Sequence, residues 1–172
     1  MSKAYLLLAD GTVFEGTGIG ASGMTIGEIV FHTGLTGYEE VLTDPSYYGQ
    51  IVMQTYPLVG NYGVNGEDPE SSRSWVKGYI VREECGYPSN YRSEGTLDRF
   101  LKVVGLCGID TRRLTRIIRE QGVMNGAITD DLSRRDELLD KIRSYAVADA
   151  VEAVTTPAPR VYPGRPGGCK VA

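Results

Sequence analysis

Residues 27–65 read GEIVFHTGLTGYEEVLTDPSYYGQIVMQTYPLVGNYGVN and hold the signals that decide the fold. Two apolar runs, 27–31 and 50–55, carry the β-branched residues that are typical of buried strands. Between them, Thr36 and Glu39 have the spacing of a capping box, which predicts the start of a helix. Pro45 ends that helix early, because its ring clashes with helical geometry at the preceding residue. The stretch therefore predicts a strand, a short helix and a second strand.

The residues on either side of this stretch indicate more β structure. Upstream, the range from Tyr5 to Val13 contains two apolar runs around Asp10-Gly11, a pair that permits the dihedral angles of a two-residue hairpin turn. Downstream, the polar composition of 65–74 predicts a loop, and 75–81 returns to the residue types of a strand. We therefore expect strands to dominate the first half of the chain.

Helical patterns begin in the second half of the chain. Residues 96–104 predict a surface helix that Gly105 closes, because their large apolar side chains recur at helical spacing. Asp110 is the predicted cap of a second helix that Gly122 ends, and a third helix begins near Ser133. Helices thus follow the strands and should cover them.

The composition changes near the end of the chain. After about Val154 the sequence becomes dense in proline and glycine, which is typical of a linker or of a run into another domain. We therefore divide the chain into one domain at 1–154 and a linker at 155–172.

Composition and charge argue against several classes of function. Lys and Arg total 18 against 22 Asp and Glu, so a net charge of -4 offers no broad basic surface to a nucleic acid. The opening apolar run, 4–9, is too short for a signal peptide or a membrane span, so we expect a cytoplasmic protein. A single histidine, His32, and three widely spaced cysteines suggest neither a zinc site nor a disulfide framework.

A glycine motif raises the alternative of a nucleotide-binding module. Gly18, Gly20 and Gly23 satisfy the pattern G-x-G-x-x-G after a predicted strand. A dinucleotide site requires a helix directly after that loop, whereas residues 24–30 continue as β structure. We therefore favour glycines at turns and bulges, and the nucleotide-binding module is retained as the alternative function.

Catalysis by this chain alone would require a nucleophile and a base. Neither Cys85 nor Cys107 stands in the Gly-x-Cys-x-Gly form of a nucleophile elbow, and His32 would have to be the base for either. The apolar neighbours Val30 and Phe31 favour a strand histidine without a chemical role. An enzyme that uses His32 with Cys107 is a second, weaker alternative.

Four arginines lie along the helix predicted after Asp110. Arg112, Arg116 and Arg119 fall near one face, with Arg113 beside them. The planar guanidinium group suits recognition of carboxylates or phosphates. A solvated helix face is the simplest interpretation, and docking of another subunit is the sharper one.

The turn Asp44-Pro45-Ser46 follows the first predicted helix. Residue types alone indicate that Ser46 is a turn or capping residue.

Three segments of the chain resemble the small subunit of glutamine-dependent carbamoyl-phosphate synthetase. These are 27–65, quoted above, LLLADGTVFEGTGIGASG at 6–23 and GIDTRRLTRIIREQGVMNGAI at 108–128. Their order and spacing also match, and the likeness extends from Ala4 to about Thr156. One departure is His32, where that family commonly has asparagine.

The resemblance implies an α/β fold, a three-layer β/β/α domain of the swivelling type with mixed sheets and helices on one side. It implies that this domain contacts the large synthetase subunit, and that a class I glutaminase domain with a Cys-His-Glu triad follows it. Cys169 precedes any nucleophile of that family, so we expect no catalytic residue, cofactor or metal in this chain. ATP and Mg²⁺ would belong to the large subunit.

One substrate contact is implied as well. Ser46 matches the serine of the family's Asp-Pro-Ser-Tyr motif, which is similar to a residue that reaches from this domain to bound glutamine. We therefore expect Ser46 to be both a turn residue and a glutamine-binding residue.

Overall fold

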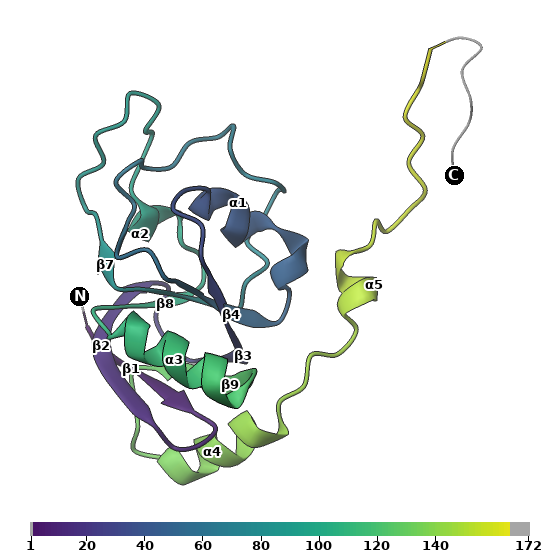
Figure 1. Ribbon diagram of the computed structural model, residues 1–172. Coiled ribbons are helices and arrows are strands. Elements are labelled where there is room, and N and C mark those ends of the chain that lie inside the picture. Colours follow the sequence, from purple (N-terminus) through teal and green to yellow (C-terminus); the bar gives the residue numbers. More distant parts are fainter. Residues whose placement is uncertain (1, 166–172) are drawn as a thin grey trace.

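A computed structural model describes residues 2–165, and a closed barrel of seven strands forms the body of that part of the chain (Figure 1). Around the barrel the order is β1, β2, β8, β6, β4, β3, β9, and β9 pairs with β1 to close the ring. The barrel strands are β1 (Lys3–Leu8), β2 (Val13–Gly20), β3 (Thr25–His32), β4 (Gln50–Gln54), β6 (Gly78–Val81), β8 (Val104–Cys107) and β9 (Met124–Thr129). The short strands β5 (Leu58–Val59) and β7 (Glu83–Glu84) pair with each other in a separate sheet.

The helical elements are short, and most of them pack on the barrel (Figure 1). They are α1 (Tyr38–Thr43), the 3-10 turn η1 (Pro45–Tyr47), α2 (Leu97–Phe100), α3 (Thr111–Gln121), α4 (Arg135–Ser144) and α5 (Ala150–Val154). Figure 1 shows α5 and the residues after it leaving the body of the molecule. Within residues 2–165, none of these helices combines the length and the apolar character that crossing a bilayer requires.

The opening hairpin is confirmed, with a longer connection than predicted. β1 and β2 pair antiparallel with Leu7 opposite Val13, and residues 9–12 join them. The connection is tightened by Asp10, whose Oδ1 accepts from the Thr12 amide at 2.8 Å. The Asp10 carboxylate thus forms a side-chain turn with Thr12, and the loop has four residues where the prediction had two.

The strand–helix–strand prediction for 27–65 is also confirmed, but its capping box is wrong. β3 and β4 pair in parallel, and α1 connects them before Pro45. The residue that precedes α1 is Gly37, in the left-handed region at φ 79°, and it makes no side-chain cap. Glu39 instead accepts a hydrogen bond from the Asn65 amide at 2.9 Å. Glu39 therefore accepts from the backbone of Asn65 and not from the nearby backbone of the predicted cap, Thr36.

The helix predicted over 96–104 is mostly wrong. α2 covers only one turn, Leu97–Phe100, and the chain is extended by Leu101. Val104–Cys107 forms β8 instead, between β2 and β6 in the barrel. Gly105 does not close a helix: a side chain there would lie 2.7 Å from an Ile19 side-chain carbon, so glycine allows the two strands to approach.

The two later helices are close to their predicted positions. Asp110 caps α3 by accepting from the Arg113 amide at 2.9 Å, and the helix stops before Gly122. α4 begins at Arg135, two residues later than predicted from Ser133. β9 and α5 were not predicted, although β9 is the strand that closes the barrel.

Three apolar clusters hold these elements together. The barrel interior is filled by alternate strand residues and is completed by Leu114 and Ile118 of α3. A second cluster lies where α1 and α2 pack on the outer face of β4 and β6, around the fully buried Tyr79. A third lies where α4 packs on β1 and β9.

The predicted α/β class with a mixed sheet is confirmed, but the placement of helices on one side is wrong. α1 and α2 cover β4 and β6, whereas α4 covers β1 and β9. A closed sheet has an outer face all the way round, so each outward apolar patch needs its own cover. The finer detail of a swivelling three-layer domain stays a prediction.

The glycine motif runs from the end of strand β2 into the turn before β3, and a strand, not a helix, follows it. Gly18 and Gly20 belong to β2, and β3 follows them where a dinucleotide site needs a helix. Nearby Gly16 shows what this strand requires, because a Cβ there would lie 2.4 Å from the Cys107 carbonyl oxygen. Gly20 fits both close packing and the turns and bulges that we predicted, because its φ is 68° and a Cβ there would lie 2.6 Å from the Val103 carbonyl oxygen. The turn position of Gly23 is consistent with that prediction, since its φ is 113°.

Candidate functional site

Ser46 lies on a turn whose backbone is held by its own neighbours. The Asp44 carboxylate accepts from the Ser46 amide at 2.8 Å, and the Tyr48 amide donates to the Pro45 carbonyl at 3.0 Å. Pro45 occupies the first position of η1, where its fixed φ suits the turn. The Ser46 side chain is exposed, and within residues 2–165 its hydroxyl has no hydrogen-bond partner. The turn therefore holds its backbone in one conformation and exposes the Ser46 hydroxyl to solvent.

The two tyrosines after Ser46 anchor this turn to the body of the protein. Tyr47 packs edge-on against His32, with ring centroids 6.4 Å apart, and Tyr48 packs against Trp75 at 6.3 Å. Burial, and next the charge of Asp44, raise the pKa of the Tyr47 hydroxyl. Both tyrosines are half-buried, whereas Ser46 is exposed.

The segment that leaves α4 lies against the same turn. The Tyr145 hydroxyl donates to the Gly49 carbonyl at 2.8 Å, and Asn125 donates to the carbonyls of Ile142 and Tyr145 at 3.1 and 2.8 Å. Gly49 has φ 82°, and a Cβ there would lie 2.7 Å from a Val147 methyl carbon. The segment after α4 therefore leaves the barrel beside Gly49, which lies three residues after Ser46 in the sequence.

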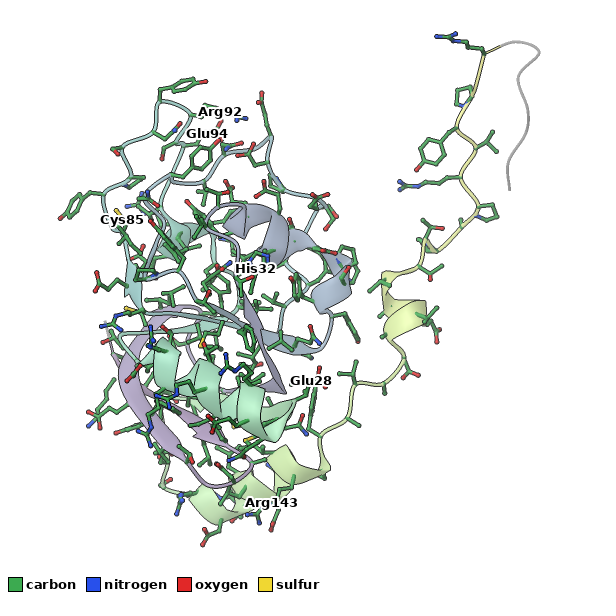
Figure 2. All side chains as sticks on the ribbon, in the orientation of Figure 1. Glu28, His32, Cys85, Arg92, Glu94 and Arg143 are labelled. Carbon is green, nitrogen blue, oxygen red and sulfur yellow. The ribbon has the colours of Figure 1, made fainter. Side chains whose placement is uncertain are left out.

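His32 does not meet a nucleophile. Its Nδ1 accepts from the Gly34 amide at 3.2 Å and lies 3.3 Å from the Gln54 side-chain oxygen. Cys107 ends β8, and two strands separate β8 from β3, each spacing being about 4.8 Å. Burial also raises the pKa of the Cys107 thiol, which lowers its reactivity. Figure 2 shows Cys85 at the margin of the molecule, away from His32.

The arginines of α3 gather around a cavity of about 620 Å³. Arg112, Arg116 and Arg119 line it, as their spacing predicted, and Arg82 lines it from the end of β6. Arg113 does not line the cavity and instead lies over the Phe14 ring, 5.1 Å from its centroid. Sequence reasoning missed Arg82, whose only signal is that a charged residue follows an apolar strand.

A second polar cluster surrounds Glu39, which is only 2% exposed. One carboxylate oxygen accepts from the Asn65 amide, and the other, Oε2, is buried without a partner among residues 2–165. Asn65 in turn donates to Asp68 at 2.8 Å, and Arg92 donates to Asp68 at 3.0 Å. Burial raises the pKa of Glu39, whereas the hydrogen bond from Asn65 is the main cause that lowers the pKa of Asp68.

The Glu39 cluster is a structural centre for two loops, 60–77 and 85–96. Arg92 also donates to the Tyr62 hydroxyl at 3.0 Å and to Glu67 at 2.9 Å, so one guanidinium joins the two loops. Across residues 2–165, no three His, Cys, Asp or Glu side chains are arranged to hold a metal ion. Cys169 lies outside the described residues.

Comparisons with known proteins identify relatives for most of the chain. The family described as "Carbamoyl-phosphate synthase small chain, CPSase domain" matches residues 6–128. The carbamoyl phosphate synthase small chain of Clostridium perfringens is 54% identical over 157 residues, which cover 90% of this chain and 45% of that protein. The small chain of Listeria monocytogenes is 49% identical over 168 residues, which cover 95% of this chain and 46% of that protein. The chain thus spans about half the length of the curated relatives it matches.

Solved structures give a weaker likeness. An aminopeptidase from Aneurinibacillus has a TM-score of 0.41 at 15% identity, over 73% of this chain and 30% of that chain.

Proposed function

Because the chain belongs to the carbamoyl-phosphate synthase small-chain family, we propose that it forms the amino-terminal domain of a small subunit. This domain docks on the large synthetase subunit and helps to position glutamine. In the complete cytoplasmic complex, ammonia from glutamine meets bicarbonate activated by ATP and Mg²⁺ on the large subunit. The product is carbamoyl phosphate, which supplies pyrimidine and arginine synthesis.

The observation that carries the substrate role is the geometry of the Ser46 turn. Its backbone donors and acceptors are satisfied locally, its aromatic neighbours are half-buried, and its hydroxyl is exposed. Such a hydroxyl can donate to a carboxylate or accept from an ammonium group, and free glutamine carries both. The residue is therefore suited to hold a substrate in place.

The exit segment supports a position beside a following domain. Tyr145 and Val147 fix the chain against Gly49, so the segment that leads toward any following domain leaves the barrel close to Ser46. The relatives are about twice as long as this chain. We place the glutaminase triad in that further part, and assign to residues 1–154 surface and one positioning hydroxyl. A swivelling three-layer arrangement belongs to the same proposal.

Substitution of Ser46 tests the substrate role. In a complete small subunit that carries these residues, assembled with its large subunit, we expect Ser46→Ala to raise the KM for glutamine. A hydrogen bond to a charged group typically contributes roughly 1.5–3 kcal/mol, which corresponds to an increase of about 12- to 160-fold. The rate of carbamoyl phosphate synthesis from added ammonia should not change, because that reaction bypasses glutamine.

The matched control is Ser89→Ala, which removes an exposed hydroxyl from the distant loop. We expect it to leave both reactions unchanged. An unaltered KM for glutamine in Ser46→Ala would contradict the assignment of Ser46. Failure of the 172-residue chain to associate with a cognate large subunit would contradict the docking role.

A further inference from the structure

We propose that the cavity beside α3 is a binding site for a small multivalent oxyanion, a molecule with at least two phosphate or carboxylate groups. The proposal is separate from the substrate role of Ser46. Ser46 lies on the turn that enters β4, whereas Thr55, which lines the cavity, follows the end of the same strand.

Charge is the first argument. Arg82, Arg112, Arg116 and Arg119 bring four guanidinium groups to one cavity. None of them pairs with a carboxylate anywhere in the part of the chain that the structure describes. The chain has 22 Asp and Glu residues and a net charge of -4, so neutralising groups are abundant elsewhere. Four unpaired cations repel one another, and a bound polyanion relieves that repulsion.

The position of the cavity is the second argument. β4, β6 and β8 are neighbours in the barrel and run parallel. Thr55 and Arg82 directly follow β4 and β6, and α3 follows β8, so the cavity lies at the carboxyl ends of three parallel strands. Parallel sheets bind small ligands at that edge, because the connecting loops diverge there. The first residues of α3, Thr111 and Arg112, also line the cavity, and the amino end of a helix favours anions.

The size and polarity of the cavity favour a small molecule over a protein partner. About 620 Å³ lies within the range of metabolite sites. Besides the four arginines, the lining consists of Thr55, Thr111, Thr115 and Pro57, and proline is its one apolar residue. The centre of a protein interface is richer in apolar and aromatic side chains. Hydroxyl and guanidinium donors on several walls suit an anion with more than one charged group.

Calorimetric titration of the 172-residue protein with inorganic pyrophosphate and with citrate tests the site at near-physiological salt. We expect one saturable site with a Kd below about 1 mM for at least one of the two anions, and none for acetate, which has a single charge. R112Q/R116Q should weaken binding by at least about tenfold. R82Q, which leaves α3 unaltered, should weaken it in the same direction.

The matched control is R113Q/R134Q, which removes the same net charge from outside the cavity. Arg113 lies on the same helix and Arg134 pairs with Glu137 on α4. This control should alter the Kd by less than about twofold. Equal weakening by the two double variants would overturn the proposal, because surface charge alone would then explain binding. Absence of saturable binding of both anions would also overturn it, and a requirement for the same arginines in subunit association would then make the cavity a docking surface.

Discussion

Glu39 is an acidic residue whose burial its sequence neighbours do not reveal. Its carboxylate is buried between α1, which carries it, and the loop 60–77, with one oxygen bonded to Asn65 and the other without a partner among residues 2–165. Burial is the main cause of its raised pKa, and the nearby acids Asp68 and Glu40 act in the same direction. The folded protein therefore binds this proton more tightly than the unfolded chain does.

The consequence is a pH-dependent stability. Because the folded pKa of Glu39 lies above the unfolded value, its favourable contribution is fully present below the unfolded pKa. That contribution is lost as the pH rises through the folded pKa. We therefore expect Glu39→Gln to flatten the decline of Tm from about pH 5 to about pH 8.

At the upper end of this range, Glu39→Gln should raise Tm by about 2–4 °C, which corresponds to roughly 1 kcal/mol. The glutamine oxygen still accepts from Asn65, while the buried charge is absent. Thermal unfolding followed by circular dichroism measures the effect, with Glu40→Gln as the neighbouring control. A Glu39→Gln profile parallel to that of the unaltered protein would show that the carboxyl is not buried as described.

At the scale of elements, local signals worked where a helix or turn satisfies itself. The Asp110 cap uses a side chain three residues from its donor, so spacing alone predicts it. The Asp10-Gly11 pair likewise predicts the position of the opening hairpin, although not the Asp10 side-chain turn. The predictions failed where a segment pairs with strands that are distant in the sequence. Leu97 to Val104 carries a helical pattern, yet pairing with β2 and β6 draws its end into β8.

The cap of α3 gives a prediction at this scale. Asp110→Ala leaves the Arg113 amide without its acceptor, which typically costs about 1 kcal/mol. We expect Tm to fall by about 2–4 °C, and Asp110→Asn to retain most of the stability because an amide oxygen also caps. Equal losses in the two variants, measured by thermal melting, would instead point to the negative charge of Asp110 as the important feature.

At the scale of the whole molecule, closure of the barrel makes distant segments depend on one another. β9, the last of these strands in the chain, pairs with β1, the first, and with β3. The apolar cluster inside the barrel contains residues from all seven strands and from α3. We therefore expect residues 3–147 to unfold as one cooperative unit.

Leu6→Ala tests that expectation. Leu6 is fully buried inside the barrel, so its truncation should cost about 2–5 kcal/mol. The single tryptophan, Trp75, packs outside the barrel beside Tyr48 and Leu42, and its fluorescence reports the second cluster. Urea midpoints from Trp75 fluorescence and from circular dichroism should both decrease by the same amount.

Val161→Ala is the control for Leu6→Ala, because Val161 is 90% exposed beyond α5 and should leave both midpoints unchanged. Separate transitions for fluorescence and circular dichroism would show that the outer cluster unfolds independently of the barrel.

The sequence by itself determined the local features of this protein: the opening hairpin, the β3–α1–β4 unit, the cap and end of α3, and three arginines on one helix face. The sequence also revealed the resemblance to a known family, because the order and spacing of motifs can be compared without a structure. Only the tertiary structure decided that β9 closes a barrel, that Arg82 joins the arginines of α3, and that Glu39 bonds to Asn65 across 26 positions. The physical reason is range: caps and turns form between residues a few positions apart, whereas barrel closure and cavity walls depend on contacts that local periodicity does not encode.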